Sequence, residues 1–142
     1  MAVPGRQPGE TPFMPENTGL PTALVVDDEP MMTRLCKSIL EGMDYEVLEA
    51  QSGEAAWELV ADLSEIGLLL TDVRMGPGMD GIELANKIRK YRPGMDIIIM
   101  SGFAEEESVK RMIADPDFRF QFLHKPFTVS ALRGAVQALR GR

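Results

Sequence analysis

The chain has 142 residues, of which 44% are hydrophobic and 26% are charged, so it is long enough for one ordinary folded domain with a single core. Its formal net charge of −7 repels a phosphate backbone, which argues against nucleic-acid binding by this chain alone. A single cysteine excludes an internal disulfide, and the sequence shows neither a membrane-spanning run nor a signal-peptide core. These properties predict a cytoplasmic protein without a membrane partner.

The first 21 residues differ in composition from the rest of the chain. They contain five prolines and three glycines. Proline interrupts both helix and sheet, and the few apolar side chains cannot offset the entropy that would be lost on ordering. We therefore predict a disordered tail over residues 1–21 and one folded domain over residues 22–142.

From Thr22 onward, short apolar runs alternate with segments of helical periodicity. The apolar runs predict strands over 23–26, 45–48, 66–70, 96–100 and 118–123. The helical spacing predicts helices over about 30–43, 52–63, 82–88, 104–115 and 129–139. Five strands that alternate with five helices imply right-handed crossovers. The predicted fold class is therefore α/β, with a five-stranded parallel sheet and helices on both faces.

Charged side chains follow three of the predicted strands. Asp27 and Asp28 come directly after the first strand, Asp72 follows the third, and Lys125 follows the fifth. The carboxyl ends of parallel strands meet along one edge of the sheet, so we expect these side chains to converge. Carboxylates at close range repel each other unless a cation or a proton intervenes. A hard cation with oxygen ligands, with Mg²⁺ as the best candidate, would remove this repulsion.

These groups together fit a phosphorylation site. Lys125 would bring a positive charge, and Ser101, after the fourth strand, would bring a hydroxyl. With a metal ion they can hold the three oxygens of a phosphoryl group while a carboxylate oxygen of Asp72 attacks phosphorus. The pair Asp27 and Asp28 alone would often be a solvated loop, and it is Asp72 and Lys125 that make the pair part of a site.

Five short motifs occur in the order and spacing of a known family. They are Asp27-Asp28-Glu29-Pro30, Thr71-Asp72-Val73-Arg74-Met75, Met79-Asp80-Gly81, Ser101-Gly102 and Phe122-Leu123-His124-Lys125-Pro126-Phe127. Over about residues 22–140 the chain resembles the receiver domain of bacterial two-component response regulators, and it is similar to the single-domain chemotaxis regulators. The resemblance implies a flavodoxin-like (βα)5 fold with strand order 2-1-3-4-5. It also implies a signalling domain rather than an enzyme.

The resemblance implies a role for each acidic residue. Asp72 matches the residue that accepts a phosphoryl group from a histidine kinase or a phosphotransfer protein. Asp28, Asp72 and the backbone carbonyl of Arg74 match the Mg²⁺ ligands, and Asp27 is expected to act through water.

The resemblance also implies a switch that starts at the phosphoryl group. Lys125 matches the lysine that contacts this group, and its peptide bond to Pro126 is expected to be cis. Ser101 is expected to move toward the phosphoryl group while the aromatic residue Phe122 turns inward. A face formed by about residues 104–140 would then change shape and bind a downstream protein target.

One departure from the family pattern concerns the loop that follows Asp72. Gly76 stands where the family usually has proline, and the loop over 75–79 is one residue longer than usual. This difference leaves open the pose of Arg74 and the rate at which the acyl phosphate hydrolyses.

Two alternative functions have distinct sequence requirements. A receiver-like module that binds partners without phosphorylation would lack an acidic, acceptor or lysine residue, and all of them are present. An aspartyl-nucleophile phosphatase would carry Asp-x-Asp after its first strand, where this chain has Asp27-Asp28-Glu29. Both a stand-alone regulator and the receiver part of a hybrid kinase remain open, and Met1 favours the first.

Overall fold

A computed structural model describes residues 19–102, 106–112 and 120–141. Most of the predicted tail lies outside these ranges, as do both ends of the predicted helix over 104–115 and the start of the predicted strand over 118–123. Within the described ranges, five strands alternate with five helices. None of the helices in this part of the chain is long and apolar enough to cross a membrane.

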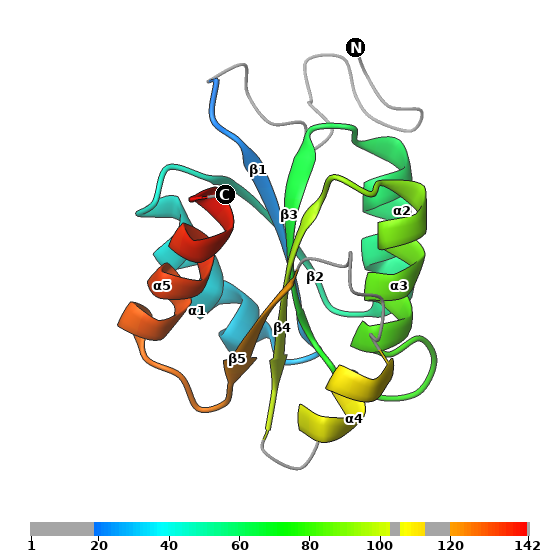
Figure 1. Ribbon diagram of the computed structural model, residues 1–142. Coiled ribbons are helices and arrows are strands. Elements are labelled where there is room, and N and C mark those ends of the chain that lie inside the picture. The colour runs from blue at the N-terminus through cyan, green and yellow to red at the C-terminus, as the bar shows by residue number, and fades with distance from the viewer. Residues whose placement is uncertain (1–18, 103–105, 113–119, 142) are drawn as a thin grey trace.

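The described strands form one parallel sheet. They are β1 (Thr22–Val26), β2 (Glu46–Ala50), β3 (Ile66–Asp72), β4 (Asp96–Ser101) and β5 (Phe120–His124). Their order in the sheet is β2-β1-β3-β4-β5, which confirms the predicted fold class and strand order. Because all strands run the same way, the ends of β1, β3, β4 and β5 lie along one edge of the sheet (Figure 1).

Helices cover both faces of the sheet. They are α1 (Pro30–Glu41), α2 (Gly53–Asp62), α3 (Gly81–Tyr91), α4 (Glu106–Met112) and α5 (Val129–Arg140). One face is covered by α1 and α5, and the other by α2, α3 and α4 (Figure 1). Local sequence signals explain two of the helix starts. Ser52 caps α2 by accepting a hydrogen bond from the Ala55 N–H at 3.0 Å, and Asp80 with Glu83 forms a capping box at α3.

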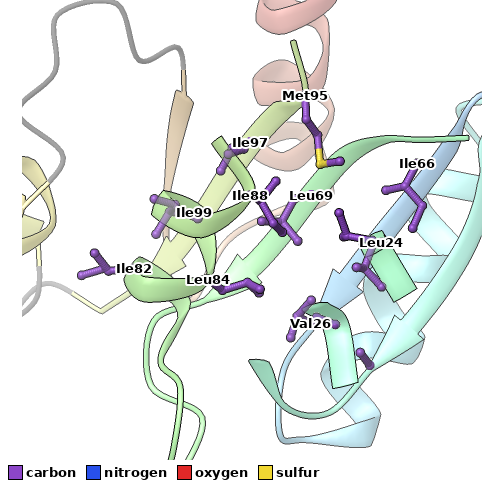
Figure 2. Close-up of a cluster of buried hydrophobic side chains, with 14 of the residues drawn as sticks. Leu24, Val26, Ile66, Leu69, Ile82, Leu84, Ile88, Met95, Ile97 and Ile99 are labelled. Carbon is purple, nitrogen blue, oxygen red and sulfur yellow. The ribbon is translucent and has the colours of Figure 1, made fainter. Parts of the chain in front are cut away.

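Buried apolar side chains fill both layers between the sheet and the helices. Leu24 and Val26 of β1 point toward α2 and α3, where they lie with residues such as Ile88 of α3 (Figure 2). Ala23 and Val25 of the same strand point to the opposite layer, toward α1 and α5. Successive strand residues face opposite sides, so a strand covered on both sides needs apolar residues at every position. This explains the unbroken apolar runs in the sequence.

Strand ends differ from the predicted ones. β2 runs to Ala50, two residues beyond its predicted end, because Glu49 and Ala50 still pair with Val25 and Val26 of β1. Backbone pairing does not depend on side-chain polarity, so an exposed Glu49 can sit inside a strand. For the same reason β3 extends to Asp72, which makes this carboxylate the last residue of a central strand.

Candidate functional site

Three carboxylates meet at the carboxyl-terminal edge of the sheet. Asp27 and Asp28 follow β1 directly, and Asp72 ends β3. One carboxylate oxygen of each residue lies within 4.8 Å of the other two. Asp27 is fully buried and Asp72 is 8% exposed, whereas Asp28 is exposed to solvent. The fold therefore brings together the acidic residues that the sequence places after two strands, with Asp28 on the solvent-exposed side of the cluster.

The ammonium group of Lys125 lies between two of these carboxylates. Its Nζ atom is 3.0 Å from Oδ2 of Asp27 and 3.3 Å from Oδ2 of Asp72. Burial lowers the pKa of Lys125, but its hydrogen bond to Asp27 and the charges of Asp72 and Asp27 outweigh burial and raise this pKa above its usual value. Lys125 therefore supplies a permanent positive charge at neutral pH.

Burial raises the pKa of the Asp72 carboxyl group to about 6. The positive charge of Lys125 lowers this pKa, and the negative charge of Asp27 raises it. Among the described residues, Asp27 and Asp72 share the ammonium group of Lys125, and Asp28 adds a third carboxylate, so negative charge remains in excess in the cluster. Hard carboxylate oxygens with uncompensated negative charge are the donor set that suits Mg²⁺.

Backbone N–H groups orient the two buried carboxylates. The Glu29 N–H donates to Oδ1 of Asp27 at 3.0 Å, and the Val73 N–H donates to Oδ1 of Asp72 at 2.9 Å. Because each Oδ1 atom is held in this way, each Oδ2 atom faces Lys125. The carboxylates are thus oriented before any ligand binds.

The start of α3 packs directly against the backbone of Asp72. A Cβ atom added at Gly81 would lie 1.9 Å from the carbonyl oxygen of Asp72, and the Gly81 N–H donates to the carbonyl of Val73 at 2.9 Å. No side chain fits at this position. The sequence motif contains Gly81, but the close approach that requires glycine becomes visible only in the fold.

Ser101 ends β4, Lys125 directly follows β5, and a backbone hydrogen bond joins the two residues. Ser101 is buried at the end of β4, and its hydroxyl donates to the carbonyl of Gly102 at 3.1 Å. The Lys125 N–H donates to the Ser101 carbonyl at 2.9 Å. The peptide bond from Lys125 to Pro126 is cis, as the family resemblance implied.

Phe122 is the third residue of β5. Its side chain is half-buried and packs against the core layer shared by α2 and α3, and its ring centroid is 4.8 Å from that of His124. None of these contacts joins Phe122 to the carboxylates. Phe122 belongs to the segment of about residues 104–140 that the sequence analysis assigned to target binding.

The loop between β3 and α3 carries a contact that no sequence motif indicated. The side chain of Arg74 is exposed, and Gly76 and Gly78 follow it with φ angles of 77° and 97°. The Met79 N–H donates to Oε2 of Glu54, at the start of α2, at 2.9 Å. Glu54 and Met79 are far apart in the sequence, and neither belongs to a pattern that would pair them.

This fold, with an aspartate cluster at the edge of its sheet, defines a class of signalling domain. Residues 23–137 match the family model described as the response regulator receiver domain. The chain belongs to this family. Receiver domains accept phosphoryl groups from histidine kinases and bind Mg²⁺ at an aspartate cluster of the kind seen here.

Relatives place similar domains in different contexts. The chemotaxis protein CheY homolog of Campylobacter jejuni is 32% identical over 122 residues, which cover 83% of this chain and 91% of that protein. The sensor kinase CckA of Brucella abortus is 35% identical over 123 residues, which cover 86% of this chain but 13% of that kinase. Response regulator TrrA of Thermotoga maritima, solved in complex with Mg²⁺ and BeF, matches with a TM-score of 0.72 and 29% identity over 84% of this chain and 99% of that one.

Proposed function

We propose that this chain is a phosphorylation-dependent switch in which Asp72 accepts a phosphoryl group. The observation that carries the proposal is the position of the Asp72 carboxylate, 3.3 Å from Nζ of Lys125 and within an acidic cluster. A nucleophilic carboxylate next to a cation and a candidate metal site has the groups that attack on phosphorus requires.

The proposed transfer assigns a separate task to each oxygen of Asp72. Oδ2 forms the new bond to phosphorus as the P–N bond of a donor phosphohistidine breaks, and the donor imidazole keeps the electron pair. Oδ1 accepts the Val73 N–H at 2.9 Å, which holds the carboxylate in one orientation. Lys125, next to Oδ2, would bind a phosphoryl oxygen.

The acidic cluster fits a Mg²⁺ ion. We propose Asp28, Asp72 and the backbone carbonyl of Arg74 as its ligands, with Asp27 acting through water. Asp27 is fully buried whereas Asp28 is exposed to solvent, which supports a direct role for Asp28 and an indirect one for Asp27. When bound, Mg²⁺ would neutralise charge on the transferred phosphoryl oxygens.

The proposed phosphoryl donor is a histidine kinase or a histidine phosphotransfer protein. Two apolar side chains of α1 support docking beside the acidic cluster, because Met31 is 82% exposed and Leu35 is 49% exposed. Met31 lies in the first turn of α1, three residues after Asp28. A donor that covers these side chains would approach Asp72 from the side of the cluster on which Asp28 is exposed to solvent.

The proposed downstream target binds the face formed by β5, α5 and the part of the chain around α4. A shallow pocket of about 410 Å³ lies between β5 and α5 and is lined by Phe122, Phe127 and Ala131 among others. We propose that Ser101 and Phe122 transmit the phosphorylation state to this face. The lysine that would contact the phosphoryl group is bonded through its N–H to Ser101, which supports coupling along β4 and β5.

Chemical phosphorylation tests the acceptor. Incubation with acetyl phosphate and Mg²⁺ should add about 80 Da to the intact protein, and hydroxylamine should remove the label because it cleaves an acyl phosphate. Asp72→Asn should abolish labelling, whereas the matched change Asp62→Asn, at an exposed position of α2, should not. Mass spectrometry of the intact protein measures both. Labelling that survives Asp72→Asn would disprove the assignment.

A further inference from the structure

The loop over residues 75–79 passes beside the acidic cluster. A Cβ atom added at Gly76 would lie 4.0 Å from Oδ2 of Asp28, so the backbone at this position lies beside the exposed carboxylate of the cluster. Gly76 and Gly78 both have positive φ angles. Two glycines in left-handed conformations accommodate the extra residue of this loop. Glycine also has the largest backbone freedom, so ordering this loop costs more entropy than ordering a loop without glycine.

The first turn of α2 holds this loop from outside. The carboxylate of Glu54 accepts the Met79 N–H at 2.9 Å, and this bond lowers the pKa of Glu54. The same carboxylate lies close to Gly78, because a Cβ atom added there would be 2.7 Å from Oε2. Gly53 also contacts the loop, since a Cβ atom at Gly53 would be 2.9 Å from that of Met79.

Both ends of the loop are fixed by the fold. Met75 is buried in the core at 4% exposure, and Asp80 caps α3. The position of the backbone between them, where Gly76 lies beside Asp28, therefore depends on the contacts that the loop residues make. The hydrogen bond from Met79 to Glu54 is such a contact, and it joins the loop to a helix that supplies no group to the acidic cluster.

We propose that Glu54 is a positioning residue for the phosphorylation site. By holding Met79 it keeps the loop over 75–79 beside Asp28, and it thereby sets the affinity for Mg²⁺ and the lifetime of the acyl phosphate. This inference rests on the proposed function, because it concerns the same metal and the same acceptor. It gives a role to the longer loop that distinguishes this chain from the usual family pattern.

A different explanation assigns Glu54 to its own helix. A carboxylate in the first turn favours the helix dipole, and it would stabilise α2 without affecting the site. Substitution separates the two roles. Glu54→Gln removes the charge but keeps an oxygen that accepts the Met79 N–H, whereas Glu54→Ala removes both.

The test is a Mg²⁺ titration of the whole chain, measured by isothermal titration calorimetry. Glu54→Ala should raise the Mg²⁺ dissociation constant about threefold to tenfold, the range that loss of one positioning hydrogen bond supports. Glu54→Gln should change it less than about twofold on the same grounds. Glu58→Ala, which removes an equal charge from an exposed position of the same helix, should leave it unchanged.

Two further measurements report on the loop and the acyl phosphate. Hydrogen exchange at the Met79 amide should speed up in Glu54→Ala and stay near the native rate in Glu54→Gln. The half-life of the acyl phosphate formed with acetyl phosphate should shorten in Glu54→Ala, because a looser loop admits water to Asp72. The denaturation midpoint of the Mg²⁺-free protein checks that the variants remain folded.

The outcomes separate this inference from the proposed function. If the native protein becomes labelled and Glu54→Ala binds Mg²⁺ with the same affinity as the native protein, the inference is overturned and the proposed function stands. Equal weakening in Glu54→Gln and Glu54→Ala would also overturn it, because charge and not loop position would then be the cause. If the native protein neither binds Mg²⁺ nor becomes labelled, both the inference and the proposed function fail.

Discussion

At the residue scale, the site is defined by one lysine that two buried carboxylates share. Lys125 contacts Oδ2 of both Asp27 and Asp72, and Asp28 adds a third negative group within 4.8 Å. The pKa of Asp72, raised to about 6, shows that Lys125 does not compensate for burial. Without a further cation, the folded protein therefore protonates Asp72 more readily than the unfolded protein does.

This imbalance predicts that Asp72→Asn stabilises the metal-free protein. The pKa of Asp72 is raised from 3.8 to about 6, so the folded state binds the proton more tightly than the unfolded state. Its contribution to stability is present at low pH and is lost as the pH rises through about 4 to 6. A neutral Asn avoids this loss. The free energy of unfolding of Asp72→Asn at pH 7.5 should exceed that of the native protein by about 1 to 3 kcal/mol.

Urea denaturation without Mg²⁺, at pH 7.5 and at a pH near 4.5, measures this difference. It should shrink at the lower pH, where Asp72 of the native protein is protonated. Asp62→Asn, at an exposed position, serves as the control and should change stability little at either pH. A native protein more stable than Asp72→Asn at pH 7.5 would show that the ion pair with Lys125 outweighs the cost of burial.

The sequence predicted which residues of the acidic site lie together, but it did not predict which of them are buried and which are exposed. Asp27, Asp28, Asp72 and Lys125 could be grouped because each follows a strand and parallel strands end together. The sequence could not tell that Asp27 would be buried and Asp28 exposed, because side-chain direction after a strand depends on how the backbone turns. It also could not pair Glu54 with the loop, since their contact depends on where α2 is placed.

At the scale of secondary structure elements, residues at helix ends make close contacts at both edges of the sheet, the acidic edge and the opposite one. At the acidic edge, Gly81 lets α3 start against the backbone of Asp72. At the opposite edge, the guanidinium group of Arg92, just after α3, donates to the carbonyls of Val60 and Leu63 near the end of α2 and of Ile66 at the start of β3. These carbonyls include groups that a helix end leaves without a helical partner.

Arg92 is therefore expected to contribute measurably to the stability of the fold. Arg92→Ala would remove three hydrogen bonds to partly buried carbonyl oxygens, and we expect the free energy of unfolding to fall by about 2 to 3 kcal/mol. Arg92→Lys keeps the charge but not the planar fork, so it should recover only part of the loss. Chemical denaturation measures all of these variants.

Lys90→Ala provides the matched control for this prediction. Lys90 is exposed in the last turn of α3, and its removal changes the net charge by the same amount. The expected effect is within about 0.5 kcal/mol, as for other surface substitutions. Equal effects of Arg92→Ala and Lys90→Ala would mean that the guanidinium contacts do not stabilise the fold.

At the scale of the whole molecule, the fold was predictable because its pattern is repeated five times. Apolar runs that alternate with helical periodicity determine a parallel sheet covered on both faces, and the structure confirms this. Strand ends were less predictable, because backbone pairing in β2 continues through the exposed Glu49. The sequence pattern reports burial, whereas strand length follows the hydrogen-bonded ladder.

At the same scale, Ser101 is expected to couple the acidic cluster to the face formed by β5 and α5. The hydroxyl of Ser101 bonds to Gly102, so movement of the hydroxyl toward a phosphoryl group would exchange one acceptor for another. With Mg²⁺ and beryllofluoride, the native protein should change its hydrogen exchange in Phe120–His124 and Val129–Arg140, and Ser101→Ala should change it much less. Ser64→Ala, at an exposed position, should respond like the native protein. If Ser101→Ala also responds like the native protein while Asp72 is still phosphorylated, the hydroxyl does not couple the site to this face, and the acceptor assignment stands without the switch.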